Sequence, residues 1–236
     1  MKVLDLCCCS GGASHGIHQA FSSAEIIGVD IIEQPDYEHQ FIKADVLKLS
    51  PEFLKQFDFI WASYPCQSYT YASKKSRNLG KKYPDLIAEG RKMLLESGKP
   101  FVIENVTTAP IRKDLILCGQ MFGLRVIRHR AFEIHGFKIQ QLQHLKHLGK
   151  VKSGYYVTVA GHGGDGKADL KSWQEAMGIF WTKNKKAIAE AVPPAYSRYI
   201  FSRFIEQLSE VKVADGTTTD GIPSKTKVLG ILPNEL

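Results

Sequence analysis

Short apolar segments alternate with helical patterns through the first half of the chain, and this alternation limits the possible folds more than any other feature. Apolar runs occupy residues 2–7, 25–30, 41–46, 57–63 and 99–106. Between them lie turn residues or helical spacing, as in residues 83–98, which end on a glycine typical of helix C-termini. Strands that alternate with helices form a mostly parallel sheet with right-handed crossovers. We therefore predict an α/β fold, with one more strand over residues 130–135.

The composition is that of a globular protein with a polyanionic partner. The 236 residues suffice for one α/β domain with a small insert, and the net charge of +7 favours binding to a polyanion. No apolar run approaches the ~20 residues that span a bilayer, and the N-terminus has no signal-peptide pattern, so no membrane association is expected. Five cysteines, three of them consecutive, do not make a disulfide framework. We expect a reducing, cytoplasmic location and a monomer.

A glycine turn follows the first predicted strand. The residues after "DLCCC" are Ser10, Gly11 and Gly12, and a helical pattern begins there. A helix N-terminus offers free N–H groups and positive charge to a carboxylate or phosphate. Asp30 ends the second strand, where a carboxylate can accept hydrogen bonds from the ribose hydroxyls of an adenosine-type ligand. Asp45 ends the third and is placed to meet an adenine amino group, so we predict a nucleoside cofactor.

The fourth and fifth predicted strands end on chemically reactive residues. Cys66 follows the fourth strand, and Pro65 stiffens the turn that presents it. Five cations and no acid lie in residues 74–82, and we expect them to favour the thiolate of Cys66. Glu104 ends the fifth strand and should face the same cleft, where burial raises the pKa of a carboxyl group until it can share a proton with a ring nitrogen. The alternative is that Glu104 only caps the next turn.

Four short motifs occur in the order seen in DNA (cytosine-5) methyltransferases. They are Pro65-Cys66-Gln67, Glu104-Asn105-Val106, Arg128-His129-Arg130 and Ala191-Val192-Pro193-Pro194. The segment "LDLCCCSGG" resembles the first, cofactor-binding motif of that family, and "GVD" and "ADV" are similar to its second and third. The resemblance extends from Lys2 to Leu208, and the compact form looks like phage-encoded orphan members of the family.

The resemblance implies a Rossmann-like fold that uses S-adenosylmethionine as cofactor and double-stranded DNA as partner. Cys66 would add to carbon 6 of a flipped-out cytosine, Glu104 would bind its N3, and carbon 5 would take the methyl group. Arg130 would hold the cytosine O2, and Arg128 would support the catalytic loop or the backbone. The implied cofactor contacts are Asp5, Leu6, Cys7, Ser10, Gly11, Gly12, Asp30, Ile31, Asp45, Val46 and Pro65. The implied DNA contacts are Gln67, Ser68, Lys74, Lys75, Arg77, Asn105 and His162.

The same resemblance divides the chain into four parts. Residues 1–136 form the catalytic core, 137–179 a small target-recognition insert, 180–211 the C-terminal helices that complete the core, and 212–236 a disordered tail. An insert this short presents few base-reading side chains, which predicts a recognition sequence of about two to four base pairs. Its candidates for base contacts are Gln143, His162 and Lys167. A strand is expected to lead into the glycine-rich loop that contains the last two.

The sequence departs from the family pattern in two motifs. In the first motif, the family usually has a glycine where Cys9 stands and an aromatic residue where Cys7 stands; before Cys66, it usually has proline or a small residue where Tyr64 stands.

Two alternative functions remain open. One alternative is a relative that methylates cytosine in RNA, such as tRNA, by the same cysteine chemistry. The other is a non-catalytic DNA-binding protein that retains the fold.

No metal site is predicted from the sequence. Consecutive cysteines at residues 7–9 would point to opposite faces of a strand and have no CxxC partner. His144 and His147 are three residues apart and read as the polar surface of a helix. Cys118 reads as a small buried hydrophobic residue.

Overall fold

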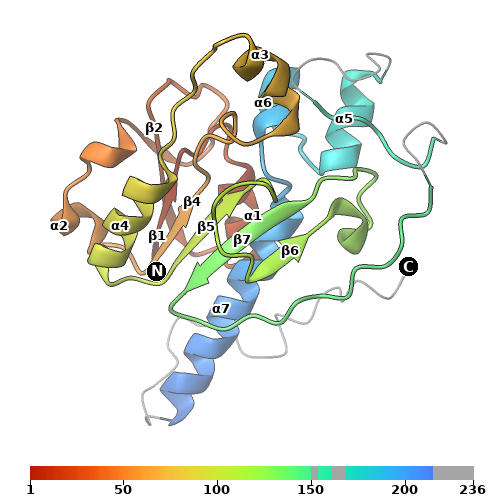
Figure 1. Ribbon diagram of the computed structural model, residues 1–236. Helices are drawn as coiled ribbons and strands as arrows, with labels where there is room; N and C mark the ends of the chain where they lie inside the picture. The colour runs from red at the N-terminus through yellow and green to blue at the C-terminus, as the bar shows by residue number, and fades with distance from the viewer. Residues whose placement is uncertain (150–153, 161–167, 215–236) are drawn as a thin grey trace.

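The computed structural model, which describes residues 1–149, 154–160 and 168–214, is built around a seven-stranded sheet (Figure 1). The strand order is β3-β2-β1-β4-β5-β7-β6. The strands are β1 (Lys2–Leu6), β2 (Glu25–Asp30), β3 (Gln40–Lys43), β4 (Phe59–Ala62), β5 (Phe101–Asn105), β6 (Leu115–Leu117) and β7 (Arg130–His135). Strands β1 to β5 run parallel to one another. Strand β7 pairs antiparallel with both β5 and β6. The predicted α/β fold with a mostly parallel sheet is confirmed.

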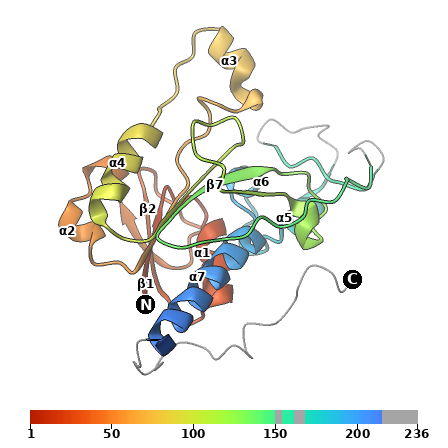
Figure 2. The same cartoon turned by 60° about the horizontal axis from the view of Figure 1, so that its bottom comes forward.

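Helices cover both faces of this sheet (Figures 1 and 2). One face carries α1 and α7, which run side by side, and the other carries α2 and α4. The helices are α1 (Gly12–Ala20), α2 (Pro51–Leu54), α3 (Lys74–Asn78), α4 (Ile87–Ser97), α5 (Leu170–Met177), α6 (Lys185–Glu190) and α7 (Pro194–Ala214). Short 3-10 turns are η1 (Val46–Lys48), η2 (Tyr71–Ser73) and η3 (Gly119–Phe122). Within the described residues, no helix combines the length and apolar character needed to cross a membrane.

Alternation along the central strands builds two hydrophobic cores. In β4, Phe59 and Trp61 belong to the core under α1 and α7, and Ile60 and Ala62 belong to the core under α4. Successive side chains of a strand point to opposite faces, so a strand that is apolar throughout must be covered on both sides. All four of these side chains are fully buried. Burial of a large one stabilises the fold by roughly 1.5–3 kcal/mol relative to exposure.

Two glycines allow α1 to lie directly against the start of α7. A Cβ at Gly12 would stand 2.2 Å from the carbonyl oxygen of Val192, and one at Gly16 would stand 2.0 Å from that of Pro194. Both obstacles are backbone atoms, which do not move without a shift of the helix. The contact therefore fixes the position of the N-terminus of α1, where the predicted cofactor turn lies.

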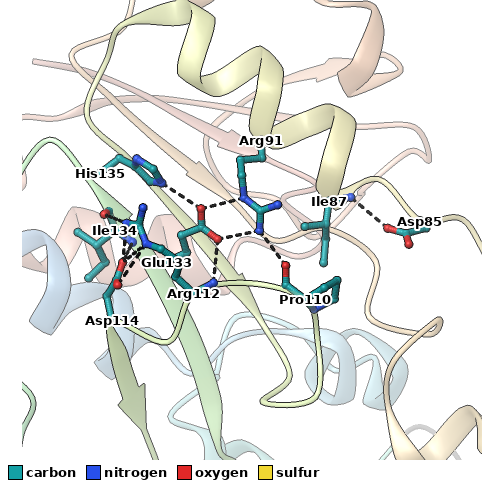
Figure 3. Close-up of polar contacts among 9 residues, drawn as sticks. All are labelled: Asp85, Ile87, Arg91, Pro110, Arg112, Asp114, Glu133, Ile134 and His135. Atoms are coloured by element: carbon teal, nitrogen blue, oxygen red, sulfur yellow. Dashed lines mark hydrogen bonds and ion pairs between the residues drawn. The ribbon is translucent and has the colours of Figure 1, made fainter.

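A buried ion pair holds β7 against α4 (Figure 3). The carboxylate of Glu133 accepts hydrogen bonds from Arg91 Nε and Nη2, both at 2.8 Å, from the backbone N–H of Arg112 at 3.0 Å and from His135 Nε2 at 3.0 Å. Burial alone would raise the pKa of Glu133, but these donors outweigh it and lower the pKa to about 2. Because Arg130 is the first residue of β7, this network also fixes the strand that carries it.

The structure differs from the sequence predictions mainly after β7. The residues that contain His144 and His147 form no helix, and residues 154–160 form no strand. Side chains replace regular backbone pairing there: Gln141 bonds both the N–H and the carbonyl of Ile116, and Gln207 does the same for Lys138. The prediction of a helix surface at the two histidines is therefore wrong.

Two element boundaries also bear on the predictions. The helix predicted to stop at Gly98 does so, with that glycine in the left-handed conformation at φ 67°. Helix α7 continues to Ala214, past residue 212, where the disordered tail was predicted to begin. Residues 215–236 lie outside the described part of the chain.

Candidate active site

Strand pairing brings the three central catalytic candidates to one edge of the sheet. Cys66 follows β4, Glu104 is in β5, and Arg130 begins β7. Strand β5 pairs in parallel with β4 and antiparallel with β7, so its carboxyl end lies beside the end of one and the beginning of the other. The charges of Glu104, Arg130 and Arg128 all act on the thiol of Cys66. The three residues thus meet at one edge of the sheet.

Glu104 forms a buried ion pair. Its carboxyl group is 7% exposed, and Arg130 Nε lies 2.9 Å from its Oε1. Burial raises the pKa of Glu104, while Arg130, Arg128 and a hydrogen bond from Ser63 lower it, and burial prevails. The carboxyl group therefore holds a proton to a higher pH than an ordinary glutamate does, as predicted.

The thiol of Cys66 has a raised pKa. Burial is the largest cause; Arg130 and Arg128 lower the pKa, and Glu104 raises it. The prediction that residues 74–82 would favour the thiolate is therefore wrong, because the cations that act most strongly on Cys66 are the two arginines at the start of β7. Burial therefore favours the thiol of Cys66 over the thiolate in the free protein.

Arg128 has a structural position. Its Nη2 donates to the carbonyl oxygens of Ala189 at 2.6 Å and Ala191 at 3.0 Å, and its side chain is buried. Arg128 therefore connects the residues just before β7 to the end of α6 and the residue that follows it. These contacts agree with the predicted role of supporting the backbone and not with contact to a reacting atom. We correct its assignment from catalytic residue to positioning residue.

Asn105 and Tyr64 shape the turn that presents Cys66. Asn105 is 1% exposed, its Nδ2 donates to the carbonyl oxygen of Tyr64 at 2.9 Å, and its Oδ1 accepts from the N–H of Val106. The DNA contact predicted for Asn105 is therefore wrong, since both ends of its amide are used inside the protein. The ring of Tyr64 fills the space above Gly90 of α4, where a Cβ would stand 2.3 Å from it. This glycine accommodates the unusual tyrosine.

The predicted DNA-binding segment forms a loop that stands away from the sheet and carries α3 (Figures 1 and 2). Arg77 Nη1 donates to the carbonyl oxygens of Gln67 at 2.6 Å and Thr70 at 2.8 Å. Ser68 Oγ donates to the carbonyl oxygens of residues 83 and 84, each at 3.2 Å. Ser68 and Arg77 therefore brace the loop, and their phosphate contacts stay predictions.

The two lysines predicted to bind DNA are placed as expected for phosphate contacts. Lys74 and Lys75 begin α3, and both are exposed. Gln67, at the base of the loop, is half-buried, and its Oε1 is a buried atom without a hydrogen-bond partner. Gln143 is exposed. His162 and Lys167 lie outside the described residues.

The end of β2 offers the groups that an adenosyl ligand needs. Asp30 accepts hydrogen bonds from the backbone N–H groups of Cys9 and Ile32, each at 3.1 Å. A carboxylate oxygen can accept more than one hydrogen bond, so Asp30 can still bind ribose hydroxyls. Ile31, beside it, is 64% exposed. Helix α1 has no side-chain cap at Gly11, which leaves N–H groups for a carboxylate. These residues fit a cofactor with an adenosyl and an amino-acid part.

Other residues of the predicted cofactor set have internal roles. Leu6 and Val46 are buried in the core under α4, so only their backbone can face a cofactor. Asp45 accepts from the N–H of Leu47 at 3.1 Å and caps η1. Gly12 contacts α7 as described, and Pro65 is half-buried in the turn before Cys66.

Asp5 is also internal. It is fully buried, and its Oδ2 accepts from Ser14 Oγ at 2.6 Å. Burial raises the pKa of Asp5 to about 7. Through Oδ2 the carboxyl group holds the first turn of α1, while its Oδ1 is buried and has no hydrogen-bond partner among the described residues, so the cofactor contact of Asp5 stays a prediction. Ser10 Oγ is buried without a hydrogen-bond partner.

Trp181 is a residue of the site that sequence reasoning missed. Its Nε1 donates to the carbonyl oxygen of Ser10 at 2.7 Å, and its ring stacks on His15 with centroids 3.5 Å apart. It therefore braces the predicted cofactor turn from a segment 171 residues away in the sequence. Nothing local marks such a role, because the contact exists only after the C-terminal part has folded back onto the core.

Cys7 and Cys9 adopt the left-handed backbone conformation, with φ 55° and 47°. Such a conformation costs an L-residue roughly 1–2 kcal/mol, whereas glycine adopts it freely. Cys9→Gly is therefore expected to raise the free energy of unfolding by about 0.5–1 kcal/mol, as measured by urea denaturation. Cys9→Ala is the control, because it removes the thiol and retains the strain. Equal stabilisation by both variants would contradict this account.

Comparisons with known proteins agree with this geometry. Residues 1–111 match the family model described as C-5 cytosine-specific DNA methylase, so the resemblance predicted from the sequence is confirmed. No curated protein matches the chain. The structure of the Entamoeba histolytica methyltransferase EhMeth is similar, with a TM-score of 0.61, 12% identity, 88% of this chain and 98% of that chain covered. An antibiotic-related methyltransferase gives a TM-score of only 0.28 at 17% identity, covering 45% of this chain and 58% of that one. The first likeness confirms a Rossmann-like fold.

Proposed function

We propose that this protein transfers a methyl group from S-adenosylmethionine to carbon 5 of cytosine in double-stranded DNA. The observation that carries the proposal is the convergence of Cys66, Glu104 and Arg130 at one edge of the sheet. The family match supports cytosine methyl transfer in general. The net charge of +7 and the exposed Lys74 and Lys75 support a nucleic-acid substrate.

The chemistry follows from the two raised pKa values. Carbon 6 of cytosine is a weak electrophile until N3 accepts a proton or a strong hydrogen bond, which the carboxyl group of Glu104 would supply because burial raises its pKa. The thiol of Cys66 gives its proton to water, its Sγ forms a bond to carbon 6, and the electron pair of the C5–C6 double bond moves into the ring as N3 takes the proton of Glu104. Carbon 5 then becomes nucleophilic and takes the methyl group. Loss of the carbon 5 proton breaks the Sγ–C6 bond and restores the aromatic ring. Glu104 recovers its proton from N3 when the Sγ–C6 bond breaks.

Each supporting residue has a place in this scheme. Arg130, whose Nε lies 2.9 Å from Glu104 Oε1, would bind the cytosine O2. Asp30, Ile31 and the N-terminus of α1 would hold the cofactor, which supplies an electrophilic methyl group when bound. The reacting atoms of cytosine are hidden in a duplex, so the base must flip out. We further propose that residues 137–179 read a short sequence of about two to four base pairs.

Trapping with DNA that contains 5-fluorocytosine tests the proposal. Fluorine at carbon 5 cannot leave as a proton, so the covalent Sγ–C6 adduct persists after methyl transfer. We expect a denaturation-resistant complex with the wild-type protein and cofactor, and none with Cys66→Ser. Circular dichroism and cofactor binding of Cys66→Ser would show that the variant is folded. An adduct with fluorinated tRNA alone would favour the RNA enzyme, and no adduct with either would favour a DNA-binding protein without activity.

A further inference from the structure

Four side chains outside the catalytic residues converge at the start of β7. They are Cys118, His129, His144 and His147, and one potential ligand atom of each lies within 4.8 Å of all the others. Cys118 Sγ is 3.5 Å from His147 Nε2, and His129 Nε2 is 3.1 Å from His144 Nε2. The four residues come from three places: the end of β6, the approach to β7, and the irregular segment that follows β7.

These separations are close to those of a tetrahedral zinc site. Zinc binds histidine nitrogen at about 2.0–2.1 Å and cysteine sulfur at about 2.3 Å. Tetrahedral angles then place two nitrogens about 3.3 Å apart, and a sulfur and a nitrogen about 3.6 Å apart. The nitrogen pair and the sulfur–nitrogen pair of the cluster lie near these values. Small rotations of the side chains would bring all four atoms to ligand distance.

We propose that Cys118, His129, His144 and His147 bind one structural Zn²⁺ ion. Thiolate and imidazole ligands together favour zinc over the hard cations Mg²⁺ and Ca²⁺, which prefer oxygen. Four protein ligands close the coordination sphere and leave no position for water or substrate, which is the pattern of structural sites and not of catalytic ones. The site is thus distinct from the methyl-transfer residues.

The surroundings of Cys118 support this assignment. Cys118 is fully buried, and its Sγ faces His147 Nε2 at 3.5 Å. The rings of His144 and His147 lie with centroids 4.9 Å apart, and those of His129 and His144 lie 5.1 Å apart. Three imidazoles gathered around one buried sulfur match the Cys and His ligand types of structural zinc sites.

The metal would fasten the segment after β7 to the catalytic strand. Hydrogen bonds already fix part of this segment: Gln120 Nε2 donates to the carbonyl oxygen of Lys146 at 3.1 Å, and Tyr156 Oη accepts from the N–H of Leu148 at 3.0 Å. His129 stands directly between Arg128 and Arg130 in the sequence. A zinc ion at His129 would therefore fix Arg130 and the irregular segment relative to each other.

Metal analysis of the full-length protein, purified without a histidine tag, tests this proposal. We expect about one zinc ion per chain in the wild type. Cys118→Ser and His144→Ala should each reduce the zinc content at least about tenfold, since losing one ligand of four opens the site. His144 is exposed, so its replacement is the variant least able to disturb folding. His18→Ala, at an exposed histidine outside the cluster, and Cys66→Ser should retain the metal.

Cobalt substitution gives an independent measurement. Co²⁺ in this site should show the visible bands of tetrahedral coordination and a thiolate charge-transfer band that disappears in Cys118→Ser. Chelation should lower the melting temperature, and Zn²⁺ but not Mg²⁺ should restore it. Wild-type protein without zinc that takes up no Co²⁺, or metal retained in both ligand variants, would overturn the proposal. Because Cys66→Ser abolishes the DNA adduct and leaves the metal, the result is independent of the proposed function.

Discussion

Replacement of Arg130 by glutamine is expected to lower kcat/KM for cytosine methylation at least about 100-fold. Arg130 is bonded to Glu104 at 2.9 Å, and its charge lowers the pKa values of both Cys66 and Glu104. Without that charge, the pKa of the Cys66 thiol rises further above its usual value. At any pH below this pKa, the fraction of reactive thiolate falls, so the alkaline rise in rate should move to higher pH.

Alkylation of Cys66 by iodoacetamide measures this shift without requiring activity. Peptide mapping follows Cys66 separately from the other cysteines, and the midpoint of its reactivity against pH should rise in Arg130→Gln by about one pH unit, the equivalent of roughly 1.4 kcal/mol. Arg130→Lys is the matched control, because it retains the positive charge and loses the planar guanidinium. Its midpoint should stay near that of the wild type, although its kcat/KM falls. An unchanged midpoint in Arg130→Gln would refute the electrostatic role of Arg130.

Gly16→Ala is expected to destabilise the protein by about 3 kcal/mol or more. The added Cβ would stand 2.0 Å from the carbonyl oxygen of Pro194, 2.1 Å from Ser197 Oγ and 2.8 Å from the backbone nitrogen of Arg198. Relief of these overlaps requires α1 to move away from α7, which opens part of the core between them. Urea denaturation should show a lower midpoint, and the affinity for cofactor should fall because α1 carries the turn at Gly11 and Gly12.

The control for this effect lies on the same helix. Gln19→Ala changes an exposed position of α1, so the free energy of unfolding should change by no more than about 0.5 kcal/mol. Alanine is a better helix former than glycine, and propensity alone would make Gly16→Ala stabilising. Stability equal to or above that of the wild type would mean that α1 and α7 are not in close contact in solution.

Much of the fold could be predicted from the pattern of apolar segments. The buried central strands are apolar on both faces, and Gly98 marks the end of α4. Strand β6 was not predicted, because its three residues, Leu115–Leu117, are too few to show any periodicity. The antiparallel direction of β7 could not be predicted from the pattern of apolar residues either, because direction depends on the connection between strands and not on the strand itself.

Site residues could be predicted where they lie at the ends of strands. They could not be predicted where their role depends on contacts between segments that are distant in the sequence. Cys66 and Glu104 could be predicted to lie together because strand ends meet at one edge of a parallel sheet, whereas Arg130 was assigned only through the resemblance to the family. Asn105 was assigned to DNA because its partner, the carbonyl oxygen of Tyr64, is 41 residues earlier in the sequence. The thiol pKa was predicted in the wrong direction because positive charge is visible in a sequence and burial is not.

The raised pKa of the Cys66 thiol also affects how fast Cys66 is oxidised while no substrate is bound. Peroxides oxidise thiolates far faster than thiols, and the first product, a sulfenic acid, cannot attack a pyrimidine. Burial that keeps the proton on sulfur therefore protects Cys66 while no base is present. For the proposed nucleophile, a proton retained on sulfur slows both the attack on a base and the loss of the thiol to peroxide.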